Sequence, residues 1–173
     1  MKAVSEAEAR SLLVERGANE MLAQSKGYKL SGAWVMPTSW KVDGDLLLDR
    51  KKYGGGLVIL DGDLDVSGLF EDTGEDSSGT TFIGVMGSLR AGDVWTGDFL
   101  FVQKDLLVKR TLYGNSGGNH TLFVDGRIEA DAIVMDGHSF ECERVRARLR
   151  IDDEGAPDPA AVRAAMAAGR SLR

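Results

Sequence analysis

One short pattern recurs six times between residues 43 and 151, and it constrains the fold more than any other feature. Each copy has an apolar anchor residue with another apolar residue two positions later; the anchors are Leu46, Leu64, Leu89, Leu106, Ile128 and Val145. In all copies but the first, the fifth and sixth residues after the anchor form a second, largely apolar or bulky pair. Apolar residues at every second position predict short β-strands. A repeat of this kind needs neighbouring repeats to bury its apolar face.

The spacing of the anchors indicates a solenoid. Consecutive anchors lie 17 to 25 residues apart, and 22 glycines supply turns between the strands. A base repeat of about 17 residues is typical of a chain that coils once per repeat. We therefore predict a mainly β protein, a single-stranded β-solenoid of about six coils over residues 40–151. Residues 28–56 contain Trp34, Trp40 and three consecutive glycines and fit the first coil poorly, so that region is either a coil or a cap.

Helical patterns bracket the repeats. Ser5 and Glu8 have the spacing of a capping box, in which the Ser hydroxyl accepts from the Glu amide and the Glu carboxylate reaches back. Asp158 before Pro159 suits the start of a second helix. We expect both helices to cover the end coils. The predicted organisation is one domain over residues 1–173, with a helical cap at 4–27, the solenoid at 40–151 and a C-terminal helix at 158–172.

Two copies of the repeat are longer than the others. Their extra residues are EDTGEDSSGT (71–80), the first insertion, and YGNSGGNH (113–120), the second insertion. Both follow the second apolar pair of their coil, so they leave equivalent corners two coils apart. Strands about 4.8 Å apart would separate the loop roots by roughly 10 Å. We expect the insertions to form one binding surface; the alternative is that they are tolerated surface insertions without function.

Negative charge is concentrated in the middle of the chain. Residues 31–139 hold 9 Lys and Arg against 17 Asp and Glu, a balance of −8, whereas the whole chain has −6. This balance disfavours nucleic acid and favours a basic partner. The predicted partner-binding residues combine the acidic cluster of the first insertion with bulky and polar residues near the same corner: Glu71, Asp72, Glu75, Asp76, Trp95, Tyr113, Asn115 and His120. The alternatives are that the acidic loop is merely solvated and that Trp95 packs in the core.

A series of aspartates between residues 61 and 65 is similar to a metal loop, but it fails the test for one. A calcium-binding EF-hand loop begun at Asp61 requires Gly at its sixth position and Glu at its twelfth, where this chain has Val66 and Asp72. We interpret the Asp-Gly pairs at 43–44, 61–62 and 125–126 as repeated corners, with Asp63 and Asp65 facing water. One Cys and two His leave little material for zinc. We therefore expect no metal and no cofactor.

The sequence offers no arrangement of catalytic residues. His120 lies in a Gly- and Asn-rich stretch and His138 follows an Asp-Gly pair, but neither has a nucleophile in a motif context. The prediction is a protein that is not an enzyme. No apolar stretch approaches the length needed to cross a bilayer. We expect a cytoplasmic location, no membrane or nucleic-acid partner, and a monomer or small homo-oligomer.

The coil phrases DGDLDVSGLF (61–70) and DGRIEADAIV (125–134) resemble those of bacterial short β-solenoid proteins, including bactofilins. The resemblance covers residues 40–151. It implies a filament-forming protein whose uncapped ends stack, but the predicted terminal helices depart from that plan because caps stop growth. In layout the chain is more similar to small, acidic, helix-flanked solenoids that act as immunity proteins against secreted bacterial toxins.

These resemblances imply three functions. The leading expectation is a non-catalytic immunity protein that blocks a cognate toxin, most naturally a basic nuclease effector, with its acidic edge and insertions. The first alternative is a bactofilin-like scaffold or filament protein. The second is a solenoid acyltransferase, which is disfavoured because the hexapeptide phasing with small corner residues is absent.

Overall fold

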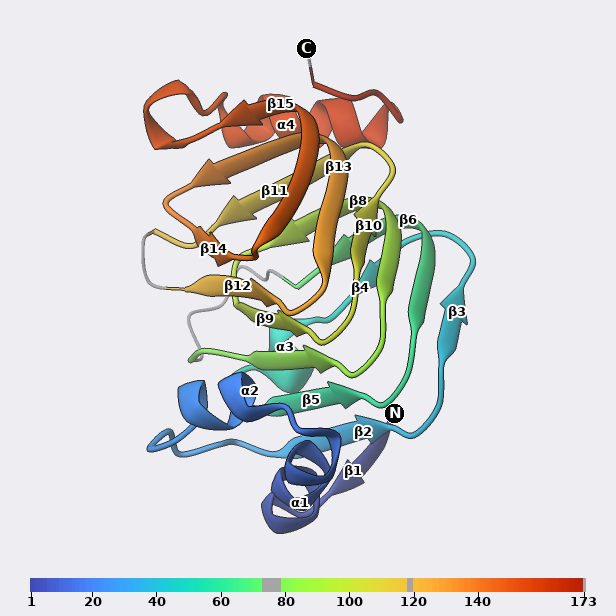
Figure 1. Cartoon of the computed structure of the whole chain (residues 1–173), viewed down its shortest axis with the longest axis vertical. Coiled ribbons are helices and arrows are strands. Elements are labelled where there is room, and N and C mark those ends of the chain that lie inside the picture. Colours follow the sequence, from blue (N-terminus) through green and yellow to red (C-terminus); the bar gives the residue numbers. More distant parts are fainter. Residues whose placement is uncertain (73–78, 118–119, 173) are drawn as a thin grey trace.

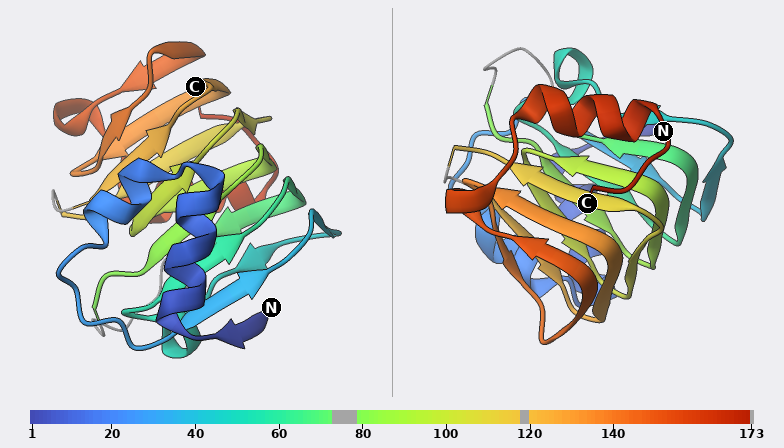
Figure 2. Two further views of the ribbon diagram at one scale, coloured as in Figure 1. Left: turned by 60° about the horizontal axis from the view of Figure 1, so that its bottom comes forward. Right: turned by 90° about the horizontal axis from the view of Figure 1, so that it is seen from above.

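Parallel strands stacked into a solenoid form the body of the protein, as the repeats predict (Figure 1). The computed structural model describes residues 1–72, 79–117 and 120–172. Helices lie against the sides of the stack at both ends of the chain (Figure 2). The fold class is therefore confirmed.

The strands form two sheets that make three faces. Face 1 is one sheet with β1 (Lys2–Val4), β2 (Ala33–Met36), β5 (Leu57–Leu60), β7 (Phe82–Val85), β9 (Phe99–Val102), β12 (Thr121–Val124) and β14 (Ser139–Glu141). The second sheet contains β3 (Trp40–Val42), β4 (Leu46–Leu47), β6 (Leu64–Glu71), β8 (Leu89–Thr96), β10 (Leu106–Val108), β11 (Thr111–Asn115), β13 (Arg127–Asp136) and β15 (Arg144–Ile151). Within it, β13 pairs with β10 along its first half and with β11 along its second half. Face 2 consists of β3, β10 and the first halves of the long strands β6, β8, β13 and β15. Face 3 consists of β4, β11 and the second halves of the same long strands.

The chain completes about five turns between β2 and β14. After them, β14 and β15 begin a further turn that does not close. The prediction of about six coils is therefore slightly too high, because the last repeat supplies strands but no complete coil. The solenoid also begins earlier than residue 40, because β2 already belongs to face 1.

Neighbouring strands keep one register along face 2, and the register of β6 against β8 shifts by one residue between Val66 and Leu69, where the chain passes to face 3. One row of face 2 holds five of the predicted anchors: Leu64, Leu89, Leu106, Ile128 and Val145. The sixth anchor is wrong, because Leu46 pairs with Phe70 on face 3 and Trp40 occupies the anchor row. The short helix α3 (Arg50–Tyr53) follows β4 and lengthens this first coil. Residues 28–56 are thus a coil with a helix inserted into it.

Inward-facing rows from all three faces fill the core. On face 3 this row consists of Leu46, Phe70, Val94, Leu112 and Ile133. In the unclosed last turn the same row ends on Arg150 instead of an apolar residue. Each complete coil therefore buries its apolar residues between two neighbours, which is the main stabilising contribution in a stacked fold.

Two N-terminal helices replace the single helical cap predicted for residues 4–27. The first, α1 (Glu6–Arg16), begins with the predicted capping box, in which Ser5 and Glu8 exchange both hydrogen bonds. Gly17 ends α1 in the left-handed conformation (φ 69°), which favours glycine. The second helix, α2 (Asn19–Gln24), starts two residues later.

These helices pack on the outer side of face 1 (Figure 2). Leu13 of α1 and Met21 of α2 are fully buried against the aromatic residues of that face. The helices thus lie along a side of the stack, where α1 packs against β2 and β5, and not across its first end as expected. The first edge of face 1 is covered by β1, which pairs with β2 in the antiparallel direction.

The C-terminal helix α4 (Pro159–Ala167) is shorter than the predicted range of 158–172. It starts after Asp158, as predicted, but the Asp158 side chain makes no capping hydrogen bond. Its last turn is followed by Gly169 in the left-handed conformation (φ 63°). A 3₁₀ turn, η1 (Asp153–Gly155), connects β15 to this helix region.

Helix α4 lies against the outer side of face 3. Its Val162 and Met166 pack on Trp95 and Tyr113. Seen from above, α4 runs along one side of the stack and leaves the last coil uncovered (Figure 2). The expectation that α4 covers an end coil is therefore wrong, because the outward aromatic residues of face 3 hold it at the side.

Glycine and aspartate recur at the corner between faces 1 and 2 for two physical reasons. A Cβ on Gly126 would lie only 2.5 Å from the Lys104 carbonyl oxygen in the preceding coil. The Asp63 carboxylate accepts from the Ser88 amide of the next coil at 2.8 Å, and this bond lowers the pKa of Asp63. Asp63 therefore ties two coils together in addition to facing water.

The predicted corner at residues 43–44 belongs to a different edge, between faces 2 and 3. A Cβ on Gly68 would lie 2.9 Å from the Gly44 carbonyl group. The Leu69 amide donates to the Asp45 carboxylate at 2.7 Å. The same combination of close glycine stacking and a carboxylate acceptor is thus repeated at a second edge.

Replacing Gly126 with alanine is expected to lower the free energy of unfolding by about 1–3 kcal/mol, because the new Cβ forces two stacked corners apart. Urea unfolding measures the change. Gly155→Ala is the matched control, since a Cβ there meets only the Ile151 Cγ2 atom, at 3.2 Å. Equal unfolding midpoints for the two variants would contradict tight stacking at this corner.

Candidate functional site

The two insertions leave the stack at one edge, between faces 3 and 1, as predicted. The first insertion follows β6 and the second follows β11, and these strands flank β8 on opposite sides. Glu71 and Tyr113 each pair in register with Trp95 of β8. We call this edge the insertion corner. It comprises the described residues of both insertions and residues 96–98, which are the last residue of β8 and the two residues that join β8 to β9.

His120 connects the two insertions. Its Nε2 atom lies 3.0 Å from the hydroxyl of Thr80, at the end of the first insertion. Its Nδ1 atom lies 2.9 Å from the Gly97 carbonyl oxygen. Because a carbonyl only accepts, Nδ1 carries the proton, and in the neutral ring Nε2 accepts from the Thr80 hydroxyl. The insertions therefore meet through a direct hydrogen bond.

Asp72 holds the same turn from the first insertion. Its carboxylate is fully buried and accepts from the Thr96 hydroxyl at 2.6 Å and from the Gly97 amide at 2.7 Å. A longer bond of 3.4 Å comes from the Asp98 amide. The N–H of Gly97 is thus bound by one insertion and its C=O by the other.

The environment of Asp72 disfavours its charged form. Burial, followed by the nearby Asp98 carboxylate, raises the pKa of Asp72 to about 7, although the bonds from Thr96 and Gly97 favour the charged form. Asp98 is also fully buried. The charge of this corner therefore changes within the neutral pH range.

Not all of the predicted acidic contact residues are exposed to solvent. Asp72 is buried in the turn that it stabilises, so its assignment as a contact residue is replaced by a structural role. Glu71 binds Arg163 of α4 through two hydrogen bonds of 2.8 and 3.0 Å, with 15% of its side chain exposed. Glu75 and Asp76 lie outside the described residues.

The predicted aromatic residues pack beneath α4. Trp95 and Tyr113 have their ring centroids 4.4 Å apart and are 7% and 0% exposed. The Tyr113 hydroxyl donates to the Asp136 carboxylate at 2.9 Å, and the Asn115 amide donates to the same carboxylate at 2.7 Å. Trp95 is therefore buried, as the alternative interpretation of the sequence holds, and so is Tyr113. Asn115 remains partly exposed at the corner.

A buried histidine lies beside the second insertion. His138 is 4% exposed, and neither of its ring nitrogens has a hydrogen-bond partner in the part of the chain that the structure describes. Burial, and then the proximity of His120, lowers the pKa of His138 to about 4. Gly114 permits this close packing, because a Cβ there would lie 2.9 Å from the His138 Cδ2 atom.

Sequence patterns do not identify Asp98, Arg163 or His138 as residues of this corner. A signal for Asp98 does exist: it follows Gly97 between two strand patterns, and a neighbouring glycine and aspartate also mark the other corners. Arg163 lies 92 positions from its partner Glu71, and no pattern in a single sequence relates the two. The sequence places His138 only in a loop, because nothing local shows that its coil packs against the second insertion.

Neither a metal-binding cluster nor a membrane-spanning helix is found among the described residues. Among residues 1–72, 79–117 and 120–172, no group of three or more His, Cys, Asp or Glu side chains is arranged to hold a metal ion. The helices of this part of the chain all lack the length and apolar character that crossing a membrane requires. The chemistry available at the insertion corner is hydrogen bonding and charge.

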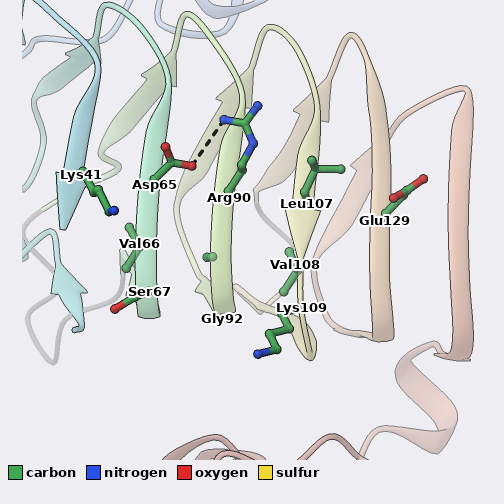
Figure 3. A pocket seen from close by; sticks show the side chains of 11 residues that line it. Lys41, Asp65, Val66, Ser67, Arg90, Gly92, Leu107, Val108, Lys109 and Glu129 are labelled. Carbon is green, nitrogen blue, oxygen red and sulfur yellow. Dashed lines mark hydrogen bonds and ion pairs between the residues drawn. The ribbon is translucent and has the colours of Figure 1, made fainter. Parts of the chain in front are cut away.

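A shallow groove of about 560 Å³ crosses face 2, away from the insertion corner (Figure 3). A row across the coils lines it with alternating charge: Lys41, Asp65, Arg90, Leu107 and Glu129. Arg90 lies 3.4 Å from Asp65, its neighbour in this row. Opposite charges on adjacent strands stabilise a sheet, so the groove has a structural explanation.

Comparison of this chain with protein-family models, with curated proteins and with solved structures finds no match. Any functional assignment therefore rests on the arrangement of the chain's own residues.

The Asp72 pKa predicts how stability depends on pH. Because it is about 7 in the folded protein against an ordinary value of 3.8, the folded state binds more protons between these values. The free energy of unfolding then falls as the pH rises through this range, by up to about 1.4 kcal/mol per pH unit from this group. Asp72→Asn keeps a neutral polar group there and is expected to flatten the dependence between about pH 5 and 7.

Denaturant unfolding at several pH values measures this effect. Asp131→Asn is the control, because the hydrogen bonds from Arg148 lower the pKa of Asp131 to about 2, well below the range studied. An unchanged slope in Asp72→Asn, compared with the wild type, would contradict the pKa assigned to Asp72.

Proposed function

We propose that this protein is a non-catalytic binding protein that neutralises a cognate bacterial toxin by direct contact, as an immunity protein in the cytoplasm. The observation that carries the proposal is the link between the two insertions through His120. Loops that are hydrogen-bonded to one another on a rigid stack present a preformed surface. Such a surface loses less conformational freedom on binding than two independent loops.

The charge of the chain supports a basic partner. Residues 31–139, which carry both insertions, have a balance of −8. The first insertion also contains Glu75 and Asp76, beyond the structural Asp72. Complementary charge speeds association and excludes wrong partners. We propose a basic nuclease toxin as the partner, because an acidic surface imitates the charge of nucleic acid.

An open end of the stack favours the alternative function, a bactofilin-like filament protein. Within the described residues, β14 pairs only with β12, and β15 pairs only with β13. Their outer edges therefore remain available for another strand. A second copy would have to bring its own first coil to this edge for a filament to grow.

Three features oppose that stacking. The corresponding edge of β2 is already paired with β1. Continuing the charged row of face 2 from Glu129 and Arg146 into the next copy would place Arg146 against Lys41. Continuing the core row of face 3 would place Arg150 against Leu46. Like charges in the first row and the desolvation of the Arg150 charge in the second both disfavour the contact, so we propose a monomer or small homo-oligomer.

Reversing the charge of the first insertion is expected to weaken binding of the toxin. The protein is captured with its partner from the native host, and affinity is then measured by calorimetry. Glu75→Lys combined with Asp76→Lys should lose at least about tenfold in affinity, because like charges would face a basic surface.

The control variant is Asp65→Lys with Glu129→Lys, which changes the net charge equally but on face 2. It should retain the wild-type affinity. An equal loss in both variants would contradict the assigned surface. Capture of no protein, together with no protection against a toxin encoded beside this gene, would contradict the immunity function.

The wild-type protein is expected to sediment as a discrete monomer or small oligomer. Arg146→Glu with Arg150→Leu removes two of the three obstacles to stacking and should shift the distribution toward larger species. Sedimentation velocity measures both samples. Persistent wild-type polymers in electron micrographs would favour the filament function instead.

A further inference from the structure

The last strand of the solenoid has a free edge and arginine at every second position. In β15 the arginines Arg144, Arg146, Arg148 and Arg150 alternate with the apolar residues Val145, Ala147, Leu149 and Ile151. One edge of β15 pairs with β13, and no strand of the described chain pairs with the other edge. In the view from above, α4 lies along the side of the stack, and the tail that follows it runs back over the stack (Figure 2). This tail reaches β15 at Arg148, whose guanidinium donates to the Leu172 carbonyl oxygen at 2.9 Å.

The inward residues of this last coil are incompletely buried. Val145 and Ala147 are partly exposed, whereas Ile128 and Leu106, in the same row as Val145, are 0% exposed. The difference arises because no further coil follows. A strand added to β15 would pair its free main-chain groups and cover these side chains.

The outward arginines determine which strand fits. Arg148 bonds Asp131, its neighbour on β13, at 2.7 and 3.1 Å. This pair shows how a carboxylate on an adjacent parallel strand meets an arginine of β15. Neither Arg144 nor Arg146 makes an ion pair with another described residue. A strand on the free edge with carboxylates at matching positions would pair with them.

The inward arginine adds a second condition. Arg150 occupies the core row that holds Ile133 in the preceding coil. Its guanidinium lies 4.8 Å from the Phe140 ring centroid and 3.8 Å from the Asp152 carboxylate, and 53% of its side chain is exposed. An apolar residue placed over Arg150 would remove its charge from water, with the 3.8 Å contact to the exposed Asp152 to offset the cost, whereas a carboxylate would pair with it. Arg150 therefore disfavours an apolar strand and favours an acidic one.

We propose that the free edge of β15 binds an extended acidic segment of a partner protein, added as a further parallel strand with a carboxylate at every second residue. A nucleic acid would satisfy the arginines but would leave the main-chain groups unpaired and Val145 and Ala147 uncovered. A peptide strand satisfies all three. Because the site lies at the end of the stack and not at the insertion corner, it is independent of the proposed toxin contact.

The probe is a synthetic peptide with the eight-residue length of β15, in which glutamate alternates with valine and both ends are blocked. Binding to the full-length protein is followed by NMR chemical shifts and by fluorescence anisotropy. We expect amide shifts centred on Arg144–Ile151 and weaker binding at high salt. Arg144→Gln combined with Arg146→Gln should reduce affinity roughly tenfold, because two charge pairs are lost.

Lys41→Gln with Lys109→Gln removes two exposed cations from the same face away from the edge and should leave peptide affinity unchanged. On face 2 the inward residues donate their N–H groups to the following coil, so the glutamates of the added strand would direct theirs toward β15. A second acidic peptide, with a methyl group on each glutamate main-chain nitrogen, keeps the charge but cannot donate these hydrogen bonds. It should fail to bind.

Three results would overturn the proposal. Equal binding of the N-methylated peptide would show charge attraction without strand addition. Equal competition by a single-stranded oligonucleotide would show a general polyanion surface. Absence of detectable peptide binding at low salt would show that the arginines only protect the edge from pairing.

Discussion

The stack depends on corner carboxylates that accept main-chain N–H groups from the next coil. Along the faces, neighbouring strands satisfy each other's main chain, but at the corners this ladder is interrupted, and a buried N–H without a partner is unfavourable. Asp63, Asp45 and Asp93 each fill such a gap by accepting from the following coil. The glycines at these corners allow the coils to approach closely enough for those bonds. Of the aspartates that are similar to a metal loop in the sequence, Asp63 is therefore a structural tie between coils, and Asp61 binds Arg16 of α1.

The insertion corner uses the same interaction at the place where two coils lengthen. The Asp72 carboxylate accepts from the Gly97 amide, just as the other aspartates accept from amides of the coils that follow them. Full burial beside Asp98 raises the pKa of Asp72 to about 7, so its charge changes near neutral pH. His120 then binds the carbonyl of the same glycine and reaches the first insertion at Thr80. The structural tie between coils thus also fixes the two insertions relative to each other. This arrangement is why we assign partner binding to this edge rather than to the groove on face 2.

The repeat predicted much of the fold, because alternation of apolar and polar residues determines which side chains point inward. It failed for the first coil for two reasons. Leu46 and Leu48 show the same apolar alternation although Leu46 lies outside the anchor row, and α3 changes the spacing of the repeat. It also misplaced the helices, since their positions depend on outward aromatic residues such as Trp95, whose covering by α4 is a long-range contact. At the site, the common corner of the insertions could be predicted from their position in the repeat. The burial of Asp72 could not, because it depends on which turn of the neighbouring coil lies beside the carboxylate.

Amide hydrogen exchange in wild type and His120→Ala tests most directly whether the two insertions form one unit. If His120 ties them, its replacement should raise exchange around residues 79–81 and 96–98 as well as beside position 120, while β9 and β12 retain wild-type protection. The first of these segments is distant in sequence and meets position 120 through the Thr80–His120 hydrogen bond. Faster exchange confined to the residues next to position 120 would contradict the account, because the insertions would then be independent loops.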